Sequence, residues 1–242
     1  GKQAMSAEAK DDLRQTLGGI CRDWWGQLAA IDPKTGREAE KGRPDRAALA
    51  ELRRIGTVSG EHGEHGEHVD VAAAVACSSR TYVRLLERLE TALRKCGKDW
   101  AIRLAERSDF PETVAVVAST LARVREDTRP DQTTAYRLGR GKDGDPVSDD
   151  NPARLMAEAR FKRLIRTRDW PGLLDQGRRI VALLGRDAPV ADLGASLLLW
   201  NAGPRTIRDW SFAYYGVAFA GRDPDASDPD DADDTAASSP AT

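Results

Sequence analysis

The chain has 242 residues, of which 40% are apolar and 31% charged, so it can build a core in one or two domains. Its formal net charge of −2 is not typical of a nucleic-acid-binding protein. No apolar run approaches the length of a membrane-spanning helix, which argues against a membrane protein. The cysteines Cys21, Cys77 and Cys96 are odd in number and widely spaced. This pattern is typical of reduced thiols, and we expect a cytoplasmic protein.

The charge is segregated along the chain. Residues 222–242 contain seven Asp against one Arg, a net charge of −6, and residues 1–221 therefore carry +4. Residues 153–186 hold eight Arg and one Lys against three acids, a net charge of +6. A polyanion responds to a local excess of positive charge and not to the net charge of the whole chain. The charge distribution is therefore compatible with a nucleic-acid partner.

Apolar residues recur with helical spacing along the chain, and no alternation typical of a sheet is found. We predict an all-α fold, a helical bundle of about eight to nine helices packed as one unit or as two small sub-bundles. In chain order, the predicted helices cover residues 7–30, 45–55, 69–95, 99–107, 111–125, 152–167, 170–184, 190–200 and 204–215.

The helices divide into two parts on either side of a polar segment. We expect an N-terminal helical part over residues 1–126, in which residues 57–67 form an exposed loop of low complexity. A basic and polar loop, residues 127–151, leads to a C-terminal helical part over residues 152–221. Residues 222–242 are rich in Asp, Ala, Ser and Pro, and we expect a disordered acidic tail there.

A short repeat holds the only histidines of the chain, His62, His65 and His68. On a helix they would share a face and could bind a divalent metal ion. Gly63 and Gly66 disfavour that helix, so an exposed repeat is the simpler interpretation. We predict no metal site, although metal binding by the repeat stays open. No known catalytic motif is present, and we predict no catalytic residues and no cofactor.

Aromatic residues gather at two places. We expect Trp24 and Trp25, on the first predicted helix, to pack in the core with a hydrogen-bond partner for an indole. A second group lies near the end of the chain and comprises Trp200, Trp210, Phe212, Tyr214 and Tyr215. These rings could stack on bases, but their helical spacing favours a core or a subunit interface.

Arginines occupy one side of three predicted helices. In residues 158–166, Phe161, Leu164 and Ile165 share a side, and the basic residues fall on the other. Residues 173–184 and 45–55 repeat this pattern, and the flexible segment 136–142 adds further positive charge. Guanidinium groups suit phosphate oxygens, so the pattern favours contact with a nucleic-acid backbone.

The candidate nucleic-acid-binding residues are Arg46, Arg53, Arg54, Arg137, Arg140, Lys142, Arg160, Arg163, Arg166, Arg178 and Arg179. A solvated face with a few ion pairs would explain a run of charge equally simply. The alternative function is that of an all-helical interaction scaffold whose arginine rows bind acidic protein surfaces.

Several motifs together carry a family resemblance. They are, in order, Trp24-Trp25, the stretch 46–54, the stretch 159–165, Arg178-Arg179-Ile180, Trp200, Trp210 and Tyr214-Tyr215. Over most of residues 13–215 the chain resembles the CasB family, the small subunit of the type I-E CRISPR surveillance complex, Cascade. The repeat at residues 61–68 and the acidic tail depart from the family pattern.

The resemblance implies an all-helical bacterial protein without enzymatic activity that takes part in antiviral defence. Its implied partners are the backbone subunits and the large subunit of Cascade, a second copy of itself, the guide RNA and the target DNA, with no membrane partner. Members of the family hold the displaced non-target strand and so stabilise the R-loop. Their basic positions match Arg53 or Arg54, Arg160, Arg166 and Arg179.

Overall fold

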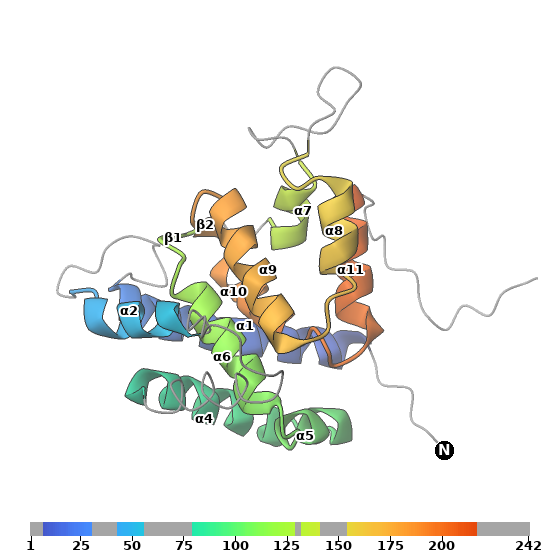
Figure 1. Ribbon diagram of the computed structural model, residues 1–242. Coiled ribbons are helices and arrows are strands. Elements are labelled where there is room, and N and C mark those ends of the chain that lie inside the picture. The colour runs from blue at the N-terminus through green and yellow to red at the C-terminus, as the bar shows by residue number, and fades with distance from the viewer. Residues whose placement is uncertain (1–6, 31–42, 56–78, 129–131, 141–153, 217–242) are drawn as a thin grey trace, which may run out of the picture.

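The computed structural model describes residues 7–30, 43–55, 79–128, 132–140 and 154–216, which form an all-α bundle (Figure 1). Its ten helices within these ranges are α1 (Ala7–Ala29), α2 (Arg46–Arg54), α4 (Arg80–Lys95), α5 (Asp99–Ala105), α6 (Phe110–Leu121), α7 (Thr134–Leu138), α8 (Glu158–Leu164), α9 (Trp170–Leu183), α10 (Val190–Leu198) and α11 (Pro204–Tyr215). The all-α prediction is therefore confirmed, with α7 as a helix that we did not expect.

Local sequence sets several of the helix boundaries. Asp45 caps α2, because its side chain accepts a hydrogen bond from the backbone N–H of Ala48 at 2.9 Å. Asp169 caps α9 in the same way through the N–H of Gly172 at 2.7 Å. The end of α11 is set by Gly216, which adopts the left-handed conformation at φ 72°.

The longest helix, α1 (blue in Figure 1), packs mainly against α10. Glycines make this contact close. A Cβ at Gly18 would lie 2.8 Å from the carbonyl oxygen of Ala191, and one at Gly194 would lie 2.7 Å from the Cβ of Cys21. Neither position can accept a larger residue without moving the helices apart. One continuous cluster of buried side chains then extends from α1 to α11, so both helical parts share a core.

The aromatic residues fill much of this core. Trp24 and Trp25 are buried, and their indole N–H groups donate to the carbonyl oxygens of Thr81 at 2.9 Å and Val124 at 3.3 Å. This confirms the prediction for the pair. Trp200 and Trp210 are also buried and meet edge to face, with ring centroids 5.0 Å apart.

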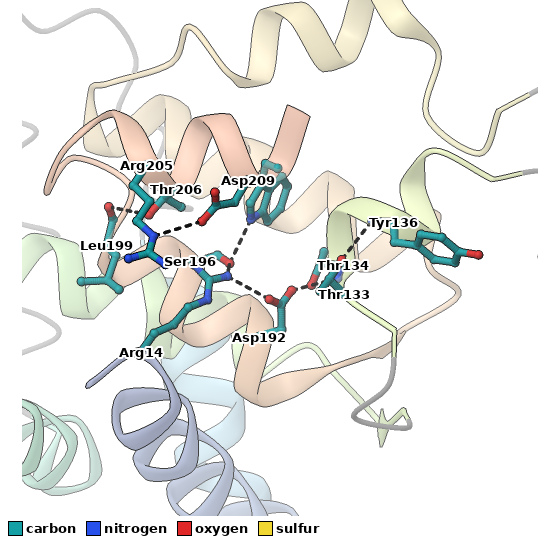
Figure 2. A network of polar contacts seen from close by, with 11 residues as sticks. Arg14, Thr133, Thr134, Tyr136, Asp192, Ser196, Leu199, Arg205, Thr206 and Asp209 are labelled. Carbon is teal, nitrogen blue, oxygen red and sulfur yellow. Dashed lines mark hydrogen bonds and ion pairs between the residues drawn. The ribbon is translucent and has the colours of Figure 1, made fainter. Parts of the chain in front are cut away.

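A polar network joins α1 to three helices of the C-terminal half (Figure 2). The guanidinium of Arg14 donates to the carboxylate of Asp192 at 2.9 Å and to the hydroxyl oxygen of Ser196 at 2.7 Å. The hydroxyl of Ser196 also accepts the indole N–H of Trp210 at 2.9 Å. The second carboxylate oxygen of Asp192 accepts the backbone N–H of Thr134 at 2.8 Å. The network thus links α1, α10, α11 and α7.

The polar segment after α6 is partly ordered by long-range pairing. Strand β1 (Glu126–Asp127) pairs in parallel with β2 (Asp187–Ala188), with Glu126 opposite Asp187. Helix α7 follows, and the N–H groups of Leu155 and Met156 donate to the carbonyl oxygens at its C-terminal end, at 2.6 and 3.0 Å. Because this pairing occupies the backbone of residues 155–156, α8 begins at Glu158 rather than near residue 152 as we expected.

Candidate nucleic-acid interface

Three elements distant in sequence bring half-buried arginines together. The Arg53 side chain, on α2, donates through Nε to the carbonyl oxygen of Ala122 at 2.7 Å. The Arg123 side chain returns a hydrogen bond to the carbonyl oxygen of Arg53 at 2.5 Å, and the Arg178 side chain on α9 donates to the carbonyl oxygen of Ile55. The three guanidiniums therefore hold α2 against the C-terminal end of α6 and against α9.

Two exposed arginines extend this group. Arg125 and Arg186 lie next to each other, because the backbone N–H of Arg125 donates to the carbonyl oxygen of Arg186 at 2.8 Å. Arg186 follows the end of α9 and has a left-handed φ of 70°. We use the name central arginine cluster for these five residues: Arg53, Arg123, Arg125, Arg178 and Arg186.

Burial and mutual repulsion act on the cluster. Burial lowers the pKa of the Arg53 guanidinium, and the positive charges of Arg186 and Arg125 lower that pKa further. The pKa of Arg123 is also lowered, first by burial and then by Arg178, Arg53 and Arg186. Arginine stays charged at neutral pH in spite of such shifts, so the cluster concentrates positive charge at the surface. An anion placed there would relieve this repulsion.

The cluster also holds donors without acceptors. The Nε atoms of Arg123 and Arg178 are buried and have no hydrogen-bond partner among the described residues. An acid does lie near Arg178, since Asp175 opposes the lowering of its pKa by burial. The same carboxylate forms an exposed ion pair with Arg179 at 2.9 Å, so the negative charge of Asp175 acts on both Arg178 and Arg179.

Helix α8 carries a second basic surface of a different kind. Phe161 and Leu164 are fully buried, as their spacing predicts, and Arg160, Arg163 and Arg166 are exposed. The guanidiniums of these three arginines make no hydrogen bond or ion pair with another residue of the described ranges. We call Arg160, Arg163 and Arg166 the α8 arginine row.

The remaining predicted residues have varied surroundings. Arg46 and Arg54 are exposed on α2. The Arg137 side chain has a structural role, since it donates to the carbonyl oxygen of Asp187 at 2.6 Å and to the Thr128 hydroxyl at 3.1 Å. Arg140 lies over the ring of Tyr136, 4.2 Å from its centroid. Lys142 lies outside the described residues.

Four arginines near these surfaces were missed by the sequence analysis: Arg123, Arg125, Arg154 and Arg186. Arg154 donates to the carbonyl oxygens of Gly139 and Tyr214, at 3.1 and 2.9 Å, and so joins α7 to α11. In the sequence, the residues directly before and after each of the four are not basic, so no run of charge marks them. Only the net charge of +6 over residues 153–186 could have pointed to two of them.

Other chemistry has little support in the described residues. His62, His65 and His68 lie outside them, and within them no three His, Cys, Asp or Glu residues form a group that could hold a metal ion. Cys21 and Cys96 are free thiols, and burial raises the pKa of Cys21 to about 12. None of the described helices is long and apolar enough to cross a membrane.

Fold and surface together define a class of protein: a small all-α bundle that presents arginines in one fixed group and one free row. Residues 48–215 match the family model of the CRISPR-associated protein Cse2. The chain therefore belongs to the Cse2 family, also known as CasB, and is a subunit of the CRISPR Cascade complex. The predicted family is thereby confirmed. No curated protein and no solved structure matches the chain.

Proposed function

We propose that the chain binds the sugar-phosphate backbone of the displaced non-target strand within Cascade and so stabilises the R-loop. The observation that carries the proposal is the central arginine cluster. Burial lowers the pKa of the half-buried Arg53 and Arg123, and neighbouring guanidiniums lower it further, because positive charge is concentrated there. A phosphate would supply the negative charge that this group lacks.

The physical role follows from the energetics of strand exchange. Formation of the guide–target heteroduplex is nearly balanced against loss of the DNA duplex, so protein contacts to the backbone can decide whether the loop stays open. A protein that holds the ejected strand slows its return to the target strand. Phosphate contacts suit this role because they act on any sequence, and the target changes with the guide.

Family membership supports the rest of the proposal. We infer that the backbone subunits and the large subunit of Cascade, a second copy of this chain, the guide RNA and the target DNA are its partners. The chain acts by binding and not by catalysis, and it requires no cofactor.

The test uses exposed members of the cluster, whose removal spares the hydrogen bonds of the core. Binding of a labelled single-stranded oligonucleotide would be measured against salt concentration for the wild type, Arg125→Gln/Arg186→Gln and the control Arg84→Gln/Arg103→Gln. The control arginines are exposed on α4 and α5 and give the same change in charge. We expect the slope of log affinity against log salt to fall by about 1.4 for the first variant, about 0.7 for each lost contact.

Two outcomes would count against the proposal. A wild-type protein that does not bind single strands would remove the proposed activity. Equal slopes for the two double variants would show that the cluster makes no phosphate contact. The alternative, an arginine surface that binds acidic proteins, would then be favoured.

A further inference from the structure

Tyr215 is the one large hydrophobic side chain of the described residues that is exposed, with 42% of its surface accessible. It is the last residue of α11, on which Trp210 and Tyr214 are buried. The other aromatic residues of this group pack mainly inward, so Tyr215 differs from them in its surroundings. An exposed ring at a helix end needs a separate explanation.

The ring of Tyr215 is held in a fixed orientation. It meets Tyr214 edge to face at 5.1 Å and Phe161 edge to face at 6.2 Å, while Tyr214 and Phe161 stack on each other at 3.8 Å. The Arg154 guanidinium lies 5.4 Å from its centroid. The pKa of Glu158 is lowered, first by Lys162 and also by a hydrogen bond from the Tyr215 hydroxyl. The ring would therefore lose little freedom when a ligand stacks on it.

Positive charge lies beside this ring. Arg154 is fixed beside it by two hydrogen bonds to backbone carbonyl oxygens, and Phe161 places the ring against α8, whose exposed side carries the α8 arginine row. Helices α8 and α11 run side by side (Figure 1). The nearby acid, Glu158, is paired with Lys162 at 2.6 Å. One ring is too small for a protein interface but matches the size of one base.

We propose that Tyr215 is a stacking platform for an unpaired base, and that the α8 arginine row binds phosphates of the same strand. This rests on the proposed function, since it names a contact to the displaced strand, and it adds a non-ionic contribution to that function. Stacking on an aromatic side chain accepts every base, so it suits a strand of variable sequence.

The experiment compares two strands of equal charge, a 20-nucleotide oligo-dT and a 20-nucleotide strand made of abasic units. Both would be titrated with the full-length wild type, Tyr215→Ala and Tyr215→Phe. We expect Tyr215→Ala to bind oligo-dT about five- to tenfold more weakly, with an unchanged salt slope, and Tyr215→Phe to bind like the wild type. We expect Tyr215→Ala to bind the abasic strand like the wild type.

Other results would overturn the inference. An equal loss of affinity for both strands would show that the ring only supports α8, and no loss for oligo-dT would show that it makes no contact. A change of oligomeric state in Tyr215→Ala, measured by light scattering, would assign the ring to a contact between copies. Failure of the proposed function would look different, because the wild type itself would then bind neither strand.

Discussion

The central arginine cluster and the α8 arginine row have the same side chains but different physical states. In the cluster, Arg53, Arg123 and Arg178 are half-buried and bonded to backbone carbonyl oxygens of neighbouring elements. In the row, the guanidiniums are exposed and make no hydrogen bond or ion pair with the rest of the described chain. Charge in a sequence therefore does not tell whether an arginine is fixed or free.

The difference has an energetic consequence for binding. A fixed guanidinium has already lost its rotational freedom during folding, so a phosphate that binds it pays less entropy than one that must order a free side chain. A fixed guanidinium also supports the fold, and its loss affects stability as well as binding. We expect the two surfaces to respond differently to the same substitution.

The largest effect should come from charge reversal at the exposed side of the cluster. Arg125→Glu/Arg186→Glu places two carboxylates beside the remaining guanidiniums, where they pair with them and repel phosphate. Within Cascade we expect guide-RNA loading to be retained and the R-loop on linear DNA to be lost about 100-fold faster, since like charges in contact cost several kcal/mol. Lifetimes of the open complex and permanganate reactivity of the displaced strand would measure this.

The same charge change elsewhere gives the control for this reversal. Arg84→Glu/Arg103→Glu alters exposed residues of α4 and α5 and should leave the R-loop lifetime near that of the wild type. Negative supercoiling should reduce the defect of the cluster variant, because it favours opening by itself. If both reversed proteins protect linear DNA like the wild type, the cluster does not hold the strand.

A second prediction separates half-buried from exposed arginines on one helix. Arg178→Ala leaves the carbonyl oxygen of Ile55 without its donor and should lower the free energy of unfolding by about 1–3 kcal/mol. The melting temperature should then fall by roughly 2–10 °C for a chain of this size. The neighbour Arg179 is exposed and forms a surface ion pair with Asp175, so Arg179→Ala should melt within about 1 °C of the wild type. Similar melting temperatures for both variants would contradict the distinction.

Single substitutions in the α8 arginine row should have a smaller effect, confined to binding. Arg160→Ala, Arg163→Ala and Arg166→Ala should each weaken single-strand binding about two- to fivefold and reduce the salt slope by about 0.7. Their melting temperatures should not change, because exposed charges contribute little to stability. A loss that depends on the base sequence would indicate direct readout of bases instead, and a marked loss of stability would show that the row is not free.

The smallest effect is expected from deletion of residues 222–242. We expect the helical circular dichroism signal and the melting temperature to stay the same, since this acidic segment has little apolar material to bury. Single-strand binding should be unchanged or rise by up to about twofold, because a tethered polyanion competes with DNA for arginines. Repeating the deletion in Arg163→Ala and in Arg125→Gln would show which surface the segment prefers. A melting temperature several degrees lower would mean that it docks on the fold.

Sequence patterns were sufficient for most of the fold. The helix predicted over residues 170–184 agrees with α9 to within one residue at each end, and the structure shows that Asp169 caps its start. Helix α7 escaped prediction because five residues are too few for a periodic signal. The β1–β2 pair escaped it because its two-residue strands lie about 60 positions apart and depend on tertiary contacts.

The candidate site was predictable only where it lies on one helix. The spacing of Phe161 and Leu164 was enough to place the exposed row of α8. The central arginine cluster could not be predicted, since Arg53, Arg123 and Arg178 meet only after α2, α6 and α9 have packed. Arg137 and Arg163 look alike in the sequence, although a backbone carbonyl and a hydroxyl oxygen accept hydrogen bonds from the Arg137 guanidinium.

The close contact between α1 and α10 has a consequence for the synthesis of this protein. During translation α1 leaves the ribosome well before α10, so Gly194 and Asp192, which contact Cys21 and Arg14, are made long after α1. The apolar side of α1, including Leu13 and Leu17, therefore lacks its packing partners until α10 has been made. At about 5–20 residues per second this delay lasts roughly ten seconds or more, a period in which a nascent chain is open to aggregation and to chaperones.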